Sequence, residues 1–100
     1  MFVASPALAA SLGLVNQVGE AISTTSVRPT SGGDWQPLGS GLSPGARQTV
    51  NVSTDSNCAF DIRVRLASGK EVTYAGVNLC ETSVVTLNRR ADGTTWVDYD

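Results

Sequence analysis

The sequence predicts an all-β protein: a small antiparallel β-sandwich of the immunoglobulin-like or Greek-key type, with six to seven strands and one disulfide. Short runs rich in β-forming residues alternate with clusters of Gly, Pro, Asn and Asp, as in sandwiches and barrels. From residue 11 onward, no segment repeats apolar residues at helical spacing. The two cysteines, Cys58 and Cys80, lie on either side of one predicted hairpin. The length of 100 residues fits a single domain, which we place at residues 11–100.

The first half of the chain contains two clear strands and a long irregular segment. Residues 11–16 are expected to form the first strand. Residues 21–29 form the second, and Pro29 ends it because proline lacks the amide hydrogen that a sheet ladder needs. Residues 30–46 contain five glycines and two prolines, so we expect an irregular segment with a short strand around residues 35–38.

The second half of the chain is divided into short strands throughout. They are expected, in chain order, at residues 47–52, 58–67, 71–77, 83–89 and 95–99. In the first of these, alternation places Val50 and Val52 on one face. The last two are separated by a turn at residues 91–93.

The apolar pattern of the hairpin predicts how its arms pair. One face of the first arm carries Cys58, Phe60, Ile62, Val64 and Leu66, and the other carries Asp61, Arg63 and Arg65. An odd connection, either a loop of residues 68–70 or a bulge at Gly69, pairs Leu66 with Val72 and Val64 with Tyr74, which keeps apolar residues on one face. A bulge or bend at Gly76 would change the pairing beyond it.

Extended to its end, this register sets Cys58 opposite Cys80, at a separation that a disulfide accepts. The alternative is a pair of buried free thiols in a cytosolic protein. A small domain with an export-like start and no C-x-x-C motif favours the disulfide. Two cysteines without a histidine do not make a zinc site.

The composition argues against catalysis and against nucleic-acid binding. The chain contains no histidine, which excludes Ser-His-Asp and Cys-His mechanisms. The acidic residues near the C-terminus do not match a calcium loop, and no glycine-rich phosphate motif occurs. The net charge of −2, without clustered basic residues, does not fit a nucleic-acid partner. We therefore expect no enzyme activity, no metal and no cofactor.

Residues 1–10 are interpreted as a residual or truncated export signal, or as an apolar N-terminal arm. Ala7 and Ala9 match the small-x-small pattern that precedes a signal cleavage site, but no basic residue precedes Arg28. Two alternatives stay open: an apolar lead into the first strand, and an arm that pairs with a sheet edge of another subunit. The run is too short to span a bilayer.

Two groups of residues are candidates for binding a partner. Trp35 and Asp34 lie in the glycine-rich segment, where a tryptophan is either a binding residue or a plug for the open end of the sandwich. Arg63 and Arg65 lie on the outward face of the hairpin. They form a stripe that binds a partner or an anion, or they belong to a solvated face on which Arg65 reaches Glu71 diagonally.

Two motifs, "DWQPLGSGLSPG" and "CAFDIRVRLASGKEVTYAGVNLC", together with "NQVGEAI" near the start, make the chain resemble a family of small exported bacterial proteins of unknown function. The resemblance covers nearly the whole chain beyond Leu12. It implies export and a Cys58–Cys80 pair, and no biochemical role. The sequence departs from the family at its N-terminus, where a complete signal would carry basic residues.

These observations lead us to expect a non-catalytic binding or structural module, secreted or periplasmic, whose partner is another protein or further copies of itself. One alternative is an inhibitor of an extracellular hydrolase, a role that suits a compact, disulfide-linked domain with an exposed loop. Another is a subunit of a cell-surface assembly that donates its apolar N-terminal arm as a strand.

Overall fold

A computed structural model describes residues 9–54, 57–80 and 82–100, which form eight β-strands and no helix. The strands are β1 (Ala9–Gln17), β2 (Ile22–Pro29), β3 (Gln36–Leu42), β4 (Arg47–Ser53), β5 (Ala59–Leu66), β6 (Glu71–Asn78), β7 (Val84–Arg89) and β8 (Thr95–Tyr99). The tentative strand around residues 35–38 is a full strand, β3. It lies at a sheet edge, where Pro37 removes no hydrogen bond from a central ladder.

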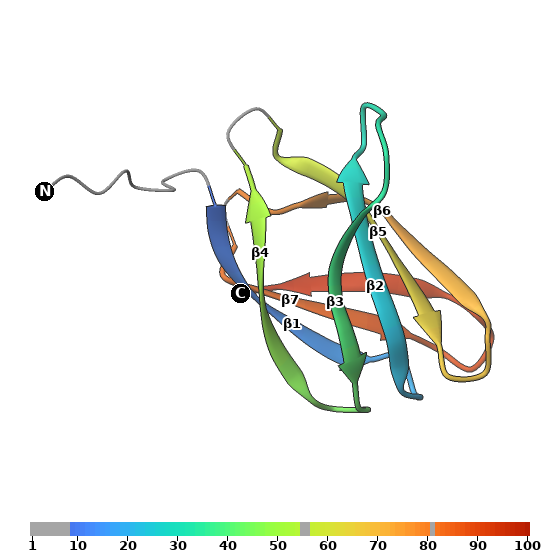
Figure 1. Ribbon diagram of the computed structural model, residues 1–100. Helices are drawn as coiled ribbons and strands as arrows, with labels where there is room; N and C mark the ends of the chain where they lie inside the picture. Colours follow the sequence, from blue (N-terminus) through green and yellow to red (C-terminus); the bar gives the residue numbers. More distant parts are fainter. Residues whose placement is uncertain (1–8, 55–56, 81) are drawn as a thin grey trace, which may run out of the picture.

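The strands form two four-stranded sheets, ordered β4-β1-β7-β8 and β3-β2-β5-β6. Figure 1 shows the three hairpins β2–β3, β5–β6 and β7–β8, and the chain passing between the sheets elsewhere. The all-β sandwich is thereby confirmed. It differs from the expectation in its eight strands, where six to seven were expected, and in one direction of pairing, because β1 runs parallel to β7 while all the other pairs are antiparallel.

The space between the sheets is filled by aliphatic side chains that alternate along the strands. The sheet of β1 and β7 contributes Leu12, Leu14, Val50, Val52, Val85 and Leu87 to this core. The opposite sheet contributes Ile22, Val27, Phe60, Ile62, Val64, Leu66, Tyr74 and Val77. The inward face predicted for the hairpin is therefore correct for its apolar residues, whereas Cys58 is exposed.

The hairpin of β5 and β6 has an odd loop, as expected, but its register is shifted by two residues. Val64 lies opposite Val72, not Tyr74, and Ile62 lies opposite Tyr74. The loop is Ala67–Gly69, closed by a hydrogen bond from the Leu66 amide to the Lys70 carbonyl, 2.8 Å. The left-handed φ of +91° at Gly69 is what a three-residue hairpin loop requires at this position.

A bulge in β6 shifts the register again before the cysteines. Two residues, Ala75 and Gly76, stand opposite Asp61 alone, and Phe60 then pairs with Val77. Gly76 has a φ of +65°, which explains why glycine suits the bulge.

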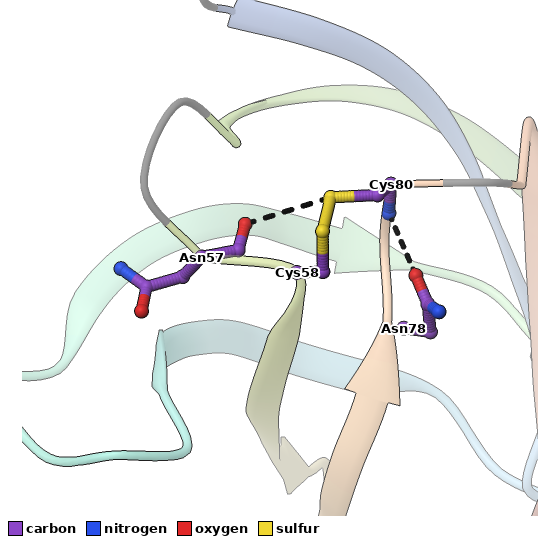
Figure 2. Close-up of a disulfide and its surroundings, with 4 residues drawn as sticks. All are labelled: Asn57, Cys58, Asn78 and Cys80. Atoms are coloured by element: carbon purple, nitrogen blue, oxygen red, sulfur yellow. Dashed lines mark hydrogen bonds between the residues drawn. A yellow bond between two sulfur atoms is a disulfide. The ribbon is translucent and has the colours of Figure 1, made fainter.

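The disulfide between Cys58 and Cys80 is confirmed, with Cα atoms 5.1 Å apart, but the two residues are not directly opposite each other, because the shifted register ends with Ala59 opposite Asn78 and so places Leu79 opposite Cys58. Figure 2 shows how the backbone around it is held. The Cys80 amide donates to Oδ1 of Asn78 at 2.9 Å, and the Leu79 amide donates to the Cys58 carbonyl at 2.9 Å. The Sγ of Cys80 lies 3.6 Å from the carbonyl oxygen of Asn57. The bond joins the two strands beyond the end of their ladder.

The interpretation of residues 1–10 falls mostly outside the described residues, because the structure describes the chain from Ala9 onward. Ala9 and Ala10 belong to β1, where they lie opposite Ser53 and Val52 of β4. No helix among the described residues is long and apolar enough to cross a membrane.

Candidate functional site

The sheet of β3-β2-β5-β6 carries on its outer face a cluster of Trp35, Arg28 and Arg63, which we call the Trp35 cluster. The Arg28 Cζ lies 4.5 Å from the centroid of the Trp35 ring, and the Arg63 Cζ lies 4.3 Å from it. These are cation–π distances. Trp35 is half-buried and does not belong to the hydrophobic core. It therefore packs on the sheet surface instead of closing the end of the sandwich.

The pairing of β2 with β5 brings the two arginines together. Arg28 lies opposite Asp61, and Arg63 lies opposite Ser26, two residues further along the ladder. Residues directly opposite one another share a face, so both guanidinium groups project from the outer side of the sheet. Trp35 immediately precedes β3, which pairs with β2, and this places its ring over the two arginines.

Asp61, which lies in β5 opposite the bulge of β6, holds the Arg28 side chain in place. Its carboxylate accepts hydrogen bonds from Arg28 Nε at 3.2 Å, from the Thr30 hydroxyl at 2.9 Å and from the Gly76 amide at 3.1 Å. Its side chain is 10% exposed, although the alternation predicted a solvated outer face. The bulge explains the difference, because it turns the Gly76 amide towards the carboxylate.

Burial of the carboxylate acts to raise the pKa of Asp61, but the three hydrogen-bond donors outweigh it, and the pKa lies below its ordinary value. Asp61 is thus a charged structural group at neutral pH. A carboxylate with a lowered pKa and three donors bound to it is poorly suited to act as a general base.

The structure places the four predicted binding residues in different surroundings. Trp35 and Arg63 come together. Asp34 is exposed beside Trp35 and makes no hydrogen bond or ion pair with another described residue. Arg65 lies directly opposite Glu71, not diagonal to it, and its Nη2 is 2.7 Å from Glu71 Oε2. Arg65 thus fits the solvated, charge-balanced face better than the binding stripe.

Arg28 is the member of the cluster that the sequence interpretation missed. A signal was available, because alternation along residues 21–29 puts Val27 inward and Arg28 outward. Its pairing with β5, and hence its position under Trp35, depends on a contact between residues 33 positions apart.

A depression of about 310 Å³ adjoins the Trp35 cluster, between β2, β3 and β4. Arg28 belongs to both, and the depression is also lined by Leu38, Pro37 and the buried Phe60. The outer face therefore offers a flat aromatic ring and two guanidinium groups, and the small apolar hollow opens next to Arg28 at the seam between β3 and β4, the edge strands of the two sheets. In the part of the chain that the structure describes, no three His, Cys, Asp or Glu side chains are grouped so as to hold a metal.

Comparison with protein-family models and with curated proteins finds no match to this sequence. Among solved structures, the chain is similar to the NMR structure of a protein from Eubacterium rectale, with a TM-score of 0.67 and 17% sequence identity. The match covers 98% of this chain and 94% of that chain. At this identity, the similarity shows that the two chains share a fold.

Proposed function

We propose that the protein is a non-catalytic binding module of the periplasm or the extracellular space, and that it contacts a protein partner through the Trp35 cluster. The observation that carries this proposal is the pair of guanidinium groups under the half-buried Trp35 ring. Tryptophan and arginine are the residue types most enriched where binding energy concentrates in interfaces.

The cluster is also organised before any partner arrives. Arg28 donates a hydrogen bond to Asp61, and Asp61 also accepts hydrogen bonds from Thr30 and from the Gly76 amide. Side chains that are already ordered lose little conformational entropy on binding, so more of the contact energy appears as affinity. The adjoining depression supplies an apolar pocket beside the polar contacts.

The compartment is inferred from the disulfide. A structural disulfide in a domain of 100 residues is typical of secreted and periplasmic proteins and rare in the cytosol. An inhibitor of an extracellular hydrolase is one form that such a compact, disulfide-linked module can take.

The test is capture of a partner from the extracellular and periplasmic fractions of the producing cells, quantified by mass spectrometry. We expect one protein to be recovered in stoichiometric amount with the native chain and to be largely lost with Trp35→Ala or Arg63→Gln. Arg65→Gln is the matched control, since Arg65 is an arginine of the same strand and face that lies outside the cluster. Recovery unaffected by Trp35→Ala, or no partner at all, would contradict the proposal.

A further inference from the structure

A second surface lies along the seam between the edge strands β6 and β8, one from each sheet. Two depressions meet there, of about 390 Å³ and about 210 Å³, and both are lined by Thr73 of β6 and Thr95 of β8. We call this continuous surface the β6–β8 groove. It is lined by strands and by the tips of two hairpins. It shares no residue with the Trp35 cluster, although Thr73 lies directly opposite Arg63 of that cluster.

The larger half of the groove is cationic. Lys70, Arg89 and Arg90 line it, against a single acidic residue, Glu71. Glu71 is already bound to Arg65, 2.7 Å away. Arg89 lies 3.7 Å from Glu20, whereas no ion pair engages Lys70 or Arg90 among the described residues. The chain carries seven basic residues and a net charge of −2, so three of them in one depression are a local excess of positive charge.

The smaller half of the groove is aromatic. Tyr74, Trp96 and Tyr99 line it. Trp96 and Tyr99 are 38% and 48% exposed, and they are the large hydrophobic residues that the described part of the chain leaves exposed. Arg90 links the two halves, because its Cζ lies 5.0 Å from the centroid of the Trp96 ring.

The hydroxyl groups of the two tyrosines are already engaged, and Tyr74 is buried in the core, so the tyrosine ring that the groove offers to a ligand is that of Tyr99. The Tyr74 hydroxyl donates to the Asn88 carbonyl at 3.0 Å, and the Tyr99 hydroxyl accepts from the Asn78 amide at 3.2 Å. Both bonds also fix the orientation of the rings. The free hydrogen-bonding groups of the groove are the threonine hydroxyls and the cationic side chains.

We propose that the β6–β8 groove binds an acidic oligosaccharide, a chain of sugar rings that carry carboxylates. Trp96 and Tyr99 alternate to opposite faces of β8, so successive sugar rings present their apolar C–H faces to one aromatic ring each, and their hydroxyls bond to Thr73 and Thr95. Its carboxylate fits the guanidinium fork of Arg90 and the ammonium group of Lys70. An acidic peptide would satisfy the cations, but exposed rings among threonine hydroxyls suit a sugar better than the apolar core of a protein interface.

The test is titration calorimetry of the full chain with a panel of uronic-acid oligosaccharides, comprising galacturonate, guluronate and mannuronate oligomers. We expect at least one to bind, with an affinity that falls as salt is raised because part of the attraction is between exposed charges. Arg90→Gln and Trp96→Ala should each weaken binding at least about tenfold, the loss expected for a charge-assisted hydrogen bond or a buried ring contact. Arg47→Gln is the matched control, since Arg47 is exposed on β4, outside the groove.

Two further probes separate the alternatives. The methyl ester of the galacturonate oligomer, which lacks the charge, should bind at least about tenfold more weakly than the acid. Poly-glutamate should bind weakly, and its binding should not depend on Trp96. The proposal is wrong if no acidic oligosaccharide binds, if the ester binds as well as the acid, or if poly-glutamate binds best. Circular dichroism melting of each variant shows whether it is folded, and Trp96→Phe, which keeps an aromatic ring, should retain most of the binding.

Discussion

At the scale of single residues, one buried amide holds together three irregular parts of the chain. Asn16 is fully buried at the end of β1. Its Nδ2 donates to the carbonyls of Glu20 and Leu42, at 2.9 and 3.0 Å, and its Oδ1 accepts from the Val18 amide at 3.0 Å. Its own backbone bonds to Gly45 and Ala46. The turn after β1, the end of β3 and the loop before β4 thus meet at one side chain.

We predict that Asn16→Ala lowers the free energy of unfolding by about 3 kcal/mol or more, because it leaves buried backbone donors and acceptors without partners. Asn51→Ala, at an exposed position of β4, is the control and should change stability by less than about 0.5 kcal/mol. Urea denaturation measures both. Equal, small effects at the two positions would show that the Asn16 contacts do not stabilise the fold.

Asp61→Asn should destabilise the protein in a pH-dependent manner. The lowered pKa of Asp61 means that the unfolded chain binds its proton more readily, so the contribution is complete above the ordinary value of 3.8 and is lost as pH falls below it. At neutral pH we expect the substitution to cost about 1–3 kcal/mol, since it removes the charged partner of Arg28. Denaturation curves at pH 7 and at about pH 3 should then show a smaller difference at the acidic pH. A difference that does not change with pH would contradict the role given to the carboxylate.

Single residues of the candidate site could be selected from the sequence, but the contacts between them could not. Trp35 and Arg63 could be selected because one is a tryptophan in a glycine-rich segment and the other an outward arginine on a clear alternation. That they touch, and that Arg28 joins them, depends on the pairing of β2 with β5, which no local pattern specifies. A bulge at Gly76 was foreseen as a possible change of register, but that it would bring a backbone amide to Asp61 and cover its carboxylate does not follow from the alternation.

At the scale of the element, the hairpin of β5 and β6 shows that the parity of a strand register and its exact value have different causes. The parity of the register follows from burial, since a slip of one residue would turn Ile62 and Val64 outward, and the odd loop was predicted on that basis. A slip of two residues keeps the faces unchanged, and so the apolar pattern cannot detect it. The pairing of Val64 with Val72, and the one-residue shift at Gly76, are set by loop and bulge geometry.

The disulfide belongs to this element, and its removal should lower stability substantially. We predict that Cys58→Ser with Cys80→Ser reduces the free energy of unfolding by about 3 kcal/mol, because the closed segment of 23 residues regains its freedom in the unfolded chain. The core pairs of β5 and β6 should persist, so the variant should give the same β-rich circular dichroism spectrum at low temperature. In the native chain, reduction should add the mass of two hydrogen atoms. An unchanged mass would contradict both the bond and the inferred compartment.

At the scale of the whole molecule, two packed sheets create two different kinds of surface. The outer face of the β3-β2-β5-β6 sheet carries the Trp35 cluster, and the seam between β6 and β8 carries the cationic and aromatic groove. The sandwich and most of its strands follow from turn residues and alternation along the chain, which indicated six to seven of the eight strands. The parallel pairing of β1 with β7 does not, because alternation has the same form whichever way a neighbouring strand runs.

Site-specific photocrosslinking tests whether the Trp35 cluster is the surface that contacts a protein partner. A photoreactive phenylalanine analogue is placed at the exposed Asp34, beside the cluster, or at the exposed Thr49 of β4, on the other sheet. Crosslinking is then carried out in the producing cells. We expect a single covalent adduct from position 34, absent when Trp35→Ala is added, and none from position 49. Equal adducts from the two positions, or an adduct from position 34 that survives Trp35→Ala, would contradict it.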